Sequence, residues 1–175
     1  MIFSHGMNRA HIAGLDVAVR EASVEDAARL AALLDGGSLT VKEDVADVAA
    51  YREALAEILA TDGQTVLVAE RGGEVVGMCQ LITFRHIQER GGRCAEVESV
   101  HVDEAWRGRG IGSTLMGEAV RRARAEGCYR VQLTSNLARV EARQWYELLG
   151  FEASHAGFKL YLDGRGGANK QGLES

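Results

Sequence analysis

The chain has 175 residues, of which 46% are hydrophobic and 26% are charged, and its formal net charge is −5. This length predicts one domain with short tails, and the balanced composition excludes a wholly disordered chain. The acidic balance argues against a nucleic-acid partner. Because no apolar run approaches the roughly 18 residues of a membrane span, we expect no membrane contact either.

The sequence has neither an export pattern nor a metal-binding pattern. No apolar signal core follows the first residues, so we expect a cytoplasmic protein. Cys79, Cys94 and Cys128 are odd in number and widely spaced, with no C-x-x-C pair, which argues against a disulfide framework or a zinc cluster. We therefore predict no metal and interpret the three cysteines as small apolar core residues.

Periodicity divides the chain into three parts. Residues 1–15 lack clear periodicity and are predicted to form a flexible N-terminal arm. Residues 164–175 are polar and glycine-rich and are predicted to form a flexible C-terminal tail. Residues 16–163 between them form the domain.

The first half of this domain has the pattern of one strand and two helices. Residues 16–20 alternate apolar and polar side chains, as a half-buried strand does. Ser23-Val24-Glu25-Asp26 is a capping box with Asp in place of the usual Glu, and it predicts a helix that stops at Gly36-Gly37. Asp44 is then expected to cap a second helix, whose apolar side chains recur near helical spacing over residues 45–59.

The pattern then changes to that of strands. Gly72-Gly73 separates two strand-like runs and can form a two-residue hairpin turn, because glycine tolerates a positive φ. The elements expected from there on are strands at 65–69 and 75–82, a polar loop at 84–93, a strand at 94–102, a helix at 110–126, a strand at 129–134, a helix at 140–149 and a closing strand at 151–162. The order β-α-α-β-β-β-α-β-α-β predicts an α/β fold with one central mixed sheet covered by helices, and a parallel crossover between residues 94 and 134.

The sharpest local signal is Arg107-Gly108-Arg109-Gly110-Ile111-Gly112-Ser113, which follows a predicted strand and opens a predicted helix. A helix start leaves backbone N–H groups unpaired and carries partial positive charge. Glycines let an anion approach that backbone, and two arginines add charge without a metal. The segment therefore predicts a cradle for a pyrophosphate. Its spacing matches neither a P-loop nor a dinucleotide-binding fingerprint.

A second signal lies downstream, where Asn136 follows a strand and the run Trp145-Tyr146-Glu147-Leu148-Leu149-Gly150-Phe151 ends a helix. Together the two signals resemble the GCN5-related N-acetyltransferase (GNAT) family. The Q/R-x-x-G-x-G/A motif of that family is matched by Arg107, Gly110 and Gly112, and its aromatic-Tyr-Glu-x-x-Gly-Phe run is matched from Trp145. The resemblance covers residues 16–162 in the same element order.

The resemblance implies the GNAT fold, with acetyl-CoA as co-substrate in a V-shaped opening between the strands 96–102 and 129–134. Val100, His101 and Val102 would then pair with the pantetheine arm through their backbone. Residues Arg107, Gly108, Arg109, Gly110, Ile111, Gly112 and Ser113 would hold the pyrophosphate, and Asn136 and Arg143 would contact the far wall. Members of the family are often dimers, so a homodimer is possible.

The implied chemistry is the attack of a neutral amine on a thioester. The resemblance makes Tyr146 the acid that protonates the departing thiolate. A phenol with a pKa of about 10 stays protonated at neutral pH and can donate that proton. Glu98 is the favoured base and Glu96 the alternative, because even-numbered residues of this strand share one face if no bulge intervenes. By the same parity His101 points to the opposite face.

The acceptor is less constrained. Residues 36–63 carry two basic and six acidic residues, which favours a cationic amine such as a polyamine, an aminoglycoside or a lysine side chain. The loop 85–93 carries three arginines, which favours an acceptor with an anionic group, and Gly127-Cys128-Tyr129-Arg130 is similar to a stretch of glucosamine-6-phosphate acetyltransferases. We predict a small metabolite amine. The alternatives are a protein N-terminus or lysine, and a non-catalytic acetyl-CoA-binding regulatory module.

Overall fold

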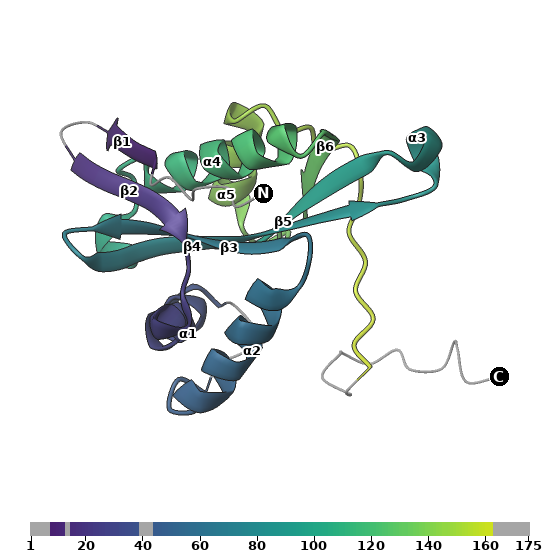
Figure 1. Cartoon of the computed structure of the whole chain (residues 1–175). Coiled ribbons are helices and arrows are strands. Elements are labelled where there is room, and N and C mark those ends of the chain that lie inside the picture. Colours follow the sequence, from purple (N-terminus) through teal and green to yellow (C-terminus); the bar gives the residue numbers. More distant parts are fainter. Residues whose placement is uncertain (1–7, 13–14, 39–43, 163–175) are drawn as a thin grey trace. The chain divides into compact units, whose positions relative to one another are not determined.

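A computed structural model describes residues 8–12, 15–38 and 44–162 (Figure 1). Its centre is a six-stranded sheet in the order β1-β2-β3-β4-β5-β6. The strands are β1 (Asn8–Ile12), β2 (Leu15–Glu21), β3 (Gln64–Arg71), β4 (Glu74–Arg85), β5 (Arg93–Val102) and β6 (Cys128–Leu133). Neighbours are antiparallel except for β5 and β6, which are parallel, as the crossover through α4 (Ile111–Ala125) predicts. The predicted mixed α/β fold is confirmed.

The described residues fall into two compact units, one ending at Leu133 and the other beginning at Thr134. The first unit holds the whole sheet with α1 (Ala27–Gly37), α2 (Val48–Ala60), the short turn α3 (Gln88–Gly91) and α4. The second holds α5 (Val140–Leu148). The sequence predicts a helix at 110–126, a strand at 129–134 and a helix at 140–149. The ends of α4, β6 and α5 differ from these predicted bounds by at most two residues.

Helices cover both faces of the sheet, with α1 and α2 on one face and α4 on the other (Figure 1). On the first face Leu30, Leu33 and Leu55 pack with Val68 and Met78 of the strands, all of them buried. This burial explains why both short helices form, because their stability comes from an apolar face rather than from length.

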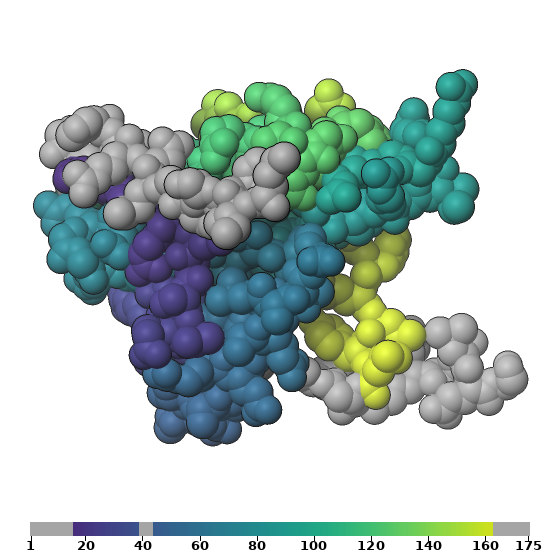
Figure 2. Space-filling view, viewed as in Figure 1, coloured from purple at the N-terminus to yellow at the C-terminus, as the bar shows by residue number. Residues whose placement is uncertain are grey.

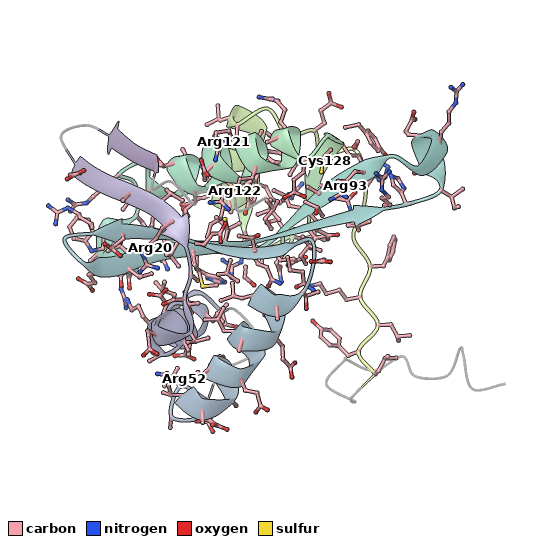
Figure 3. The ribbon with its side chains drawn as sticks, in the orientation of Figure 1. Arg20, Arg52, Arg93, Arg121, Arg122 and Cys128 are labelled. Atoms are coloured by element: carbon pink, nitrogen blue, oxygen red, sulfur yellow. The ribbon has the colours of Figure 1, made fainter. Side chains whose placement is uncertain are left out.

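On the opposite face, α4 is fixed by charge as well as by its apolar stripe. Glu118 is buried and accepts hydrogen bonds from Arg121 at 2.6 Å and from Arg122 at 2.9 Å, and Arg122 also pairs with Glu21 at the end of β2. Figure 3 shows Arg121 and Arg122 side by side on this helix. Because a buried carboxylate is stable only when it is paired, these contacts fix the position of α4 on the sheet.

Three local expectations need correction. The second helix begins later than predicted, at Val48, and its cap is Asp47, whose carboxylate accepts the N–H of Ala50 at 3.1 Å; Asp44 instead accepts the N–H of Ala46 at 3.2 Å. Residues 8–12, within the predicted arm, form β1, an edge strand that pairs with β2 through backbone bonds and so needs little side-chain periodicity. The polar loop is shorter than predicted because β4 continues to Arg85 and β5 begins at Arg93.

The predicted closing strand at 151–162 is not formed. The described residues in this range have no strand geometry, and Phe158 and Leu160 are exposed. An alternating apolar pattern indicates a strand only if a neighbouring strand pairs its backbone groups. Residues 151–162 have strand-like side chains, but no neighbouring strand among the described residues pairs with their backbone.

The turn between β4 and β5 projects from the sheet, as the teal atoms show in the space-filling view (Figure 2). Glu89 and Arg90 have left-handed backbone conformations, with φ of 51° and 57°, and Ile87 is almost fully exposed. Non-glycine residues adopt this conformation rarely, so the turn differs from an ordinary helical turn.

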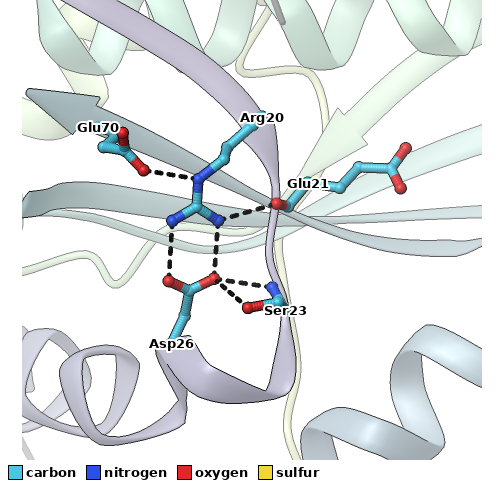
Figure 4. Close-up of polar contacts among 5 residues, drawn as sticks. All are labelled: Arg20, Glu21, Ser23, Asp26 and Glu70. Carbon is cyan, nitrogen blue, oxygen red and sulfur yellow. Dashed lines mark hydrogen bonds and ion pairs between the residues drawn. The ribbon is translucent and has the colours of Figure 1, made fainter. Parts of the chain in front are cut away.

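Arg20 joins β2, β3 and the start of the first helix in one hydrogen-bonded group (Figure 4). Its guanidinium donates to both carboxylate oxygens of Asp26, at 2.8 and 2.9 Å, and to Glu70 at 2.7 Å. Asp26 also accepts the backbone N–H of Ser23 at 2.7 Å, as the capping box predicts. Burial tends to raise the pKa of Asp26, but the hydrogen bonds from Arg20 and Ser23 outweigh it and hold that pKa below its ordinary value.

We expect Asp26→Asn to lower the free energy of unfolding by about 2 kcal/mol at pH 7, since charge-assisted hydrogen bonds contribute roughly this much. A carboxylate whose pKa is depressed by folding stabilises the protein above its unfolded pKa of about 4 and loses that effect as the pH falls through the folded value. The difference in the free energy of unfolding between the wild-type protein and Asp26→Asn, measured by urea titration, should therefore become smaller below about pH 4. Asp62→Asn, on an exposed residue, is the matched control. If Asp26→Asn and Asp62→Asn changed the free energy of unfolding equally, the Asp26 carboxylate would not have this stabilising role.

Candidate functional site

The edge of β5 is paired over only half of its length on the side of β6. Pairing with β6 ends where Val97 meets Leu133, whereas pairing with β4 continues on the other side to Val102. In the described chain, β5 therefore extends from Glu98 to Val102 without a partner strand on that edge. Its backbone N–H and C=O groups there can pair with an extended, amide-containing ligand.

A β-bulge lies just beyond the point where the pairing of β5 with β6 ends. Gln80 of β4 is opposite Glu98 and Met78 is opposite His101, so two residues of β5 face the single residue between them on β4. Ser99, inside the bulge, has φ of 51°. Bulges of this kind redirect side chains and are frequent beside active sites.

The bulge overturns the parity prediction for this strand. Glu96 and Glu98 share a face, as predicted, because their β4 partners are two residues apart. His101 shares that face too, since its partner Met78 is two residues from Gln80, and Val102 lies on the opposite face with Gly77. Glu98 and His101 therefore both project on the side of the sheet that α1 and α2 cover.

His101 is also close to the end of α1. A Cβ added at Gly37 would lie 1.9 Å from Nδ1 of His101, so a larger residue at this position would force the imidazole to move. The end of α1 therefore contacts His101 on the same face as the predicted base, Glu98.

An apolar pocket of about 90 Å³ lies beside these residues, between α1, α2 and the sheet. Its lining includes the polar side chains of Tyr51 and Gln80, and the amide of Gln80 donates to Gln64 at 2.9 Å. Of the acidic residues expected to form an acceptor wall, the described ones do not line it, since Glu53 and Glu57 are exposed on α2; Glu43 lies outside the described residues. Ligand pockets usually measure roughly 300–1,000 Å³, so this pocket can hold only a small part of a substrate.

The arginines of the β4–β5 turn are largely engaged elsewhere. Arg93 pairs with Glu126 at 3.2 Å, and Arg85 donates to the carbonyl of Gly91 at 2.8 Å. Arg93 and Cys128 lie close together at the start of β5 and β6 (Figure 3). The next residue but one on β6, Arg130, donates to Sγ of Cys94 at 3.4 Å and stacks on Tyr129. The predicted anionic subsite of this loop stays a prediction.

The predicted phosphate cradle lies where β5 leads into α4. Asp103 begins a short 3₁₀ turn, η2 (Glu104–Trp106), by accepting the N–H of Ala105 at 2.9 Å, and Arg29 of α1 donates to the same carboxylate at 2.7 Å. Arg107 then donates Nε to the carbonyl of Val102 at 3.1 Å. These contacts hold the first part of the loop, from Asp103 to Arg107. Sequence analysis missed Arg29, because its role depends on a contact with a distant segment.

Two glycines give this loop its shape. Gly108 and Gly110 have φ of 72° and 82°, and Gly110 immediately precedes α4 without a side-chain cap. The start of this 15-residue helix therefore has no side-chain cap, and the helix dipole favours an anion there. Ile111 is 1% exposed, so its side chain belongs to the core and only its backbone can take part; Gly112 and Ser113 complete the first turn.

The remaining predicted residues belong to the unit that begins at Thr134. Tyr146 on α5 contacts the rings of Trp145 and Phe151, with centroids 4.7 and 6.0 Å away. Asn136 accepts the N–H of Ala138 at 2.9 Å, and Arg143 is exposed. Their approach to β5 stays a prediction.

Three further observations concern the described part of the chain. It contains no group of three or more His, Cys, Asp or Glu side chains arranged to hold a metal ion. None of its helices is long and apolar enough to cross a membrane. Burial raises the pKa of the Cys79 thiol to about 12, which leaves it protonated and unsuited to act as a nucleophile. The expected homodimer and cytoplasmic location stay predictions.

Comparisons with known proteins agree with this geometry. The Acetyltransferase (GNAT) family profile matches residues 37–151. The chain is 30% identical over 144 residues to an aminoalkylphosphonate N-acetyltransferase of Salmonella typhimurium, covering 82% of this chain and 90% of the relative. It is 33% identical over 116 residues to a glucosamine 6-phosphate N-acetyltransferase of Oryza sativa subsp. japonica, covering 65% and 68%. A crystal structure described as a transcriptional regulator from Bacillus halodurans superposes with a TM-score of 0.79 at 34% identity, covering 83% and 99%.

We expect Gly108→Ala to weaken acetyl-CoA binding about tenfold, because a left-handed alanine costs roughly 1–2 kcal/mol and the loop must turn its N–H groups away to relieve it. Isothermal titration calorimetry measures the affinity. Gly36→Ala is the matched control: a Cβ meets nothing within 4 Å at either position, and only Gly108 has a positive φ. Wild-type affinity in Gly108→Ala would show that the cradle does not depend on this backbone geometry.

Proposed function

The chain belongs to the acetyltransferase (GNAT) family and is an acetyl-CoA-dependent N-acetyltransferase, and we propose that its acceptor is the primary amine of a small metabolite. The amine attacks the thioester directly while both substrates are bound. The observation that carries the proposal is the end of β5–β6 pairing at Val97: β5 continues beyond its last β6 partner to Val102 and leads directly into the glycine and arginine loop.

This arrangement suits the shape of acetyl-CoA. The pantetheine arm carries amide groups, which pair with the backbone of Val100, His101 and Val102 as an added strand would. The pyrophosphate lies on the first turn of α4, where Arg107 and Arg109 neutralise its charge. The thioester is thereby placed at the bulge, beside Glu98.

Three tasks remain for the protein in the chemical step. Glu98 takes the proton of the incoming ammonium, directly or through one water, because an alkylammonium has a pKa of about 10 and must be neutral to attack. A backbone N–H near Val100 stabilises the oxyanion that forms at the thioester carbonyl. Tyr146 gives its proton to the sulfur as the C–S bond breaks. Asn136 and Arg143 have no part in these three steps, and their proposed role is to contact the cofactor from the far side.

The geometry of β5 favours Glu98 over Glu96 as the base. Glu96 lies where β5 and β6 are still paired and accepts the side-chain amide of Gln132 at 3.2 Å. Glu98 lies one step beyond the last pair, next to the bulge. A base must reach the reacting amine, so the residue at the open segment is better placed.

Two relatives support a small acceptor. The names of the Salmonella and rice proteins describe acetylation of an aminoalkylphosphonate and of glucosamine 6-phosphate, each a small amine with an anionic group. Acetylation of a protein N-terminus or a lysine is the alternative.

Acetyl-CoA-dependent thiol release, measured with a panel of amines, tests the acceptor class. We expect release with a small amine, from a set that includes an aminoalkylphosphonate, glucosamine 6-phosphate, a polyamine and an aminoglycoside, and none with peptides that carry a free N-terminus or lysine. Release with peptides alone would identify a protein acetyltransferase instead. Calorimetric binding of acetyl-CoA without release on any amine would overturn the proposed acceptor class.

Tyr146→Phe should lower kcat about 100-fold, a typical contribution of a general acid, and change the Kd of acetyl-CoA less than about twofold. Single-turnover kinetics separates the chemical step from product release. Tyr161→Phe, on a tyrosine that is 43% exposed, serves as control and should leave kcat unchanged. An unchanged single-turnover rate in Tyr146→Phe would remove this residue from the acid role.

A further inference from the structure

We propose that Arg71, at the end of β3, binds the 3′-phosphate of acetyl-CoA and that Trp106 positions it for this role. The inference rests on the proposed placement of the pyrophosphate on the loop from Arg107 to Ser113. It adds a residue from a different hairpin to the cofactor site, outside the segment that the sequence motif marks.

Trp106 brings two arginines together. The guanidinium carbon of Arg71 lies 4.5 Å from the centre of the Trp106 ring, and that of Arg109 lies 5.0 Å from the same centre. Trp106 is half-buried at the end of η2, immediately before the cradle, whereas both arginines are exposed. Cation–π contacts at exposed sites contribute roughly 0.5–1 kcal/mol, enough to restrict a long side chain to one region.

Among the described residues, the arginines at this site form no direct ion pair with a carboxylate, although the pKa of Asp103, lowered chiefly by its hydrogen bond from Arg29, is also lowered by the nearby charge of Arg107. Six arginines of the described chain form ion pairs with Asp or Glu, and they are Arg20, Arg29, Arg52, Arg93, Arg121 and Arg122. Among the same described residues, Arg71, Arg107 and Arg109 have no carboxylate within ion-pair distance. Of the acidic residues close to them in sequence, Glu70 pairs with Arg20, and Glu74 and Asp103 both pair with Arg29.

Three cations that converge on one loop repel one another, and a multivalent anion relieves that repulsion. Acetyl-CoA carries such an anion, since its pyrophosphate and its 3′-phosphate are separated by a single ribose. The backbone amides at the start of α4, together with Arg107 and Arg109, bind the pyrophosphate. The 3′-phosphate is a monoester close to a dianion at neutral pH, and a guanidinium is the side chain that matches its geometry. Arg71 reaches the loop from the side, on the hairpin turn at Gly72-Gly73, so it is the cation available for the outlying phosphate.

The test compares the binding of coenzyme A and of 3′-dephospho-coenzyme A by isothermal titration calorimetry. The wild-type protein should bind coenzyme A about tenfold more tightly, as expected for one charge-assisted phosphate contact. Arg71→Met should lose this preference: its Kd for coenzyme A rises about tenfold, and its Kd for the dephospho form stays within about twofold of wild type.

Arg124→Met is the matched control, because it removes the same charge from the last turn of α4, roughly 20 Å from the cradle along the helix. It should retain the preference. Trp106→Leu should reduce the preference, and Trp106→Phe, which keeps an aromatic face, should restore most of it. Thermal melting verifies that each variant is folded.

Each outcome has a distinct meaning. If Arg71→Met weakens both ligands equally, or neither, while the wild-type protein binds coenzyme A, the role of Arg71 is wrong and the proposed function is unaffected. If the wild-type protein binds neither ligand, the proposed cofactor site is wrong and the inference falls with it. Because binding needs no acceptor, these results do not depend on the identity of the amine.

Discussion

The end of β5–β6 pairing at Val97 is the constraint on which the site depends. A strand edge in a folded protein must pair its N–H and C=O groups with another chain, with water or with a ligand. Because β4 holds β5 in place to Val102, the open edge is rigid on one side and available on the other. The first part of the loop that follows is also held, since Arg29 pairs with Asp103 and Arg107 donates to the carbonyl of Val102. A cofactor thus meets a surface that is arranged before binding.

The bulge at Ser99 determines what this surface presents to the acceptor. Without it, His101 would point toward α4; with it, His101 and Glu98 share the face covered by α1 and α2. One extra residue in a strand therefore decides which ionisable groups lie on the face where we propose that the thioester binds. Strand parity read from a sequence predicts side-chain direction only up to the first bulge.

Local chemistry made much of this molecule predictable. The glycines and arginines of the cradle, the capping box at Ser23 and the helix that ends at Gly37 follow from backbone rules that act over a few residues. What failed depends on distant partners. The closing strand has the right side chains without a partner strand among the described residues. Arg71 shows no motif at all, because only the fold brings its hairpin to Trp106.

The proposed cofactor contacts on β5 use main-chain groups, and this separates two kinds of evolutionary freedom. A substitution at Val100 or Val102 changes a side chain and leaves the backbone N–H where it was, so binding of the shared cofactor tolerates drift in sequence. Side chains on the face of Glu98 and His101 can change to suit another amine without disturbing that pairing. A single strand thus keeps the acetyl donor constant while the acceptor varies, which makes the fold well suited to acquire new substrates by few mutations.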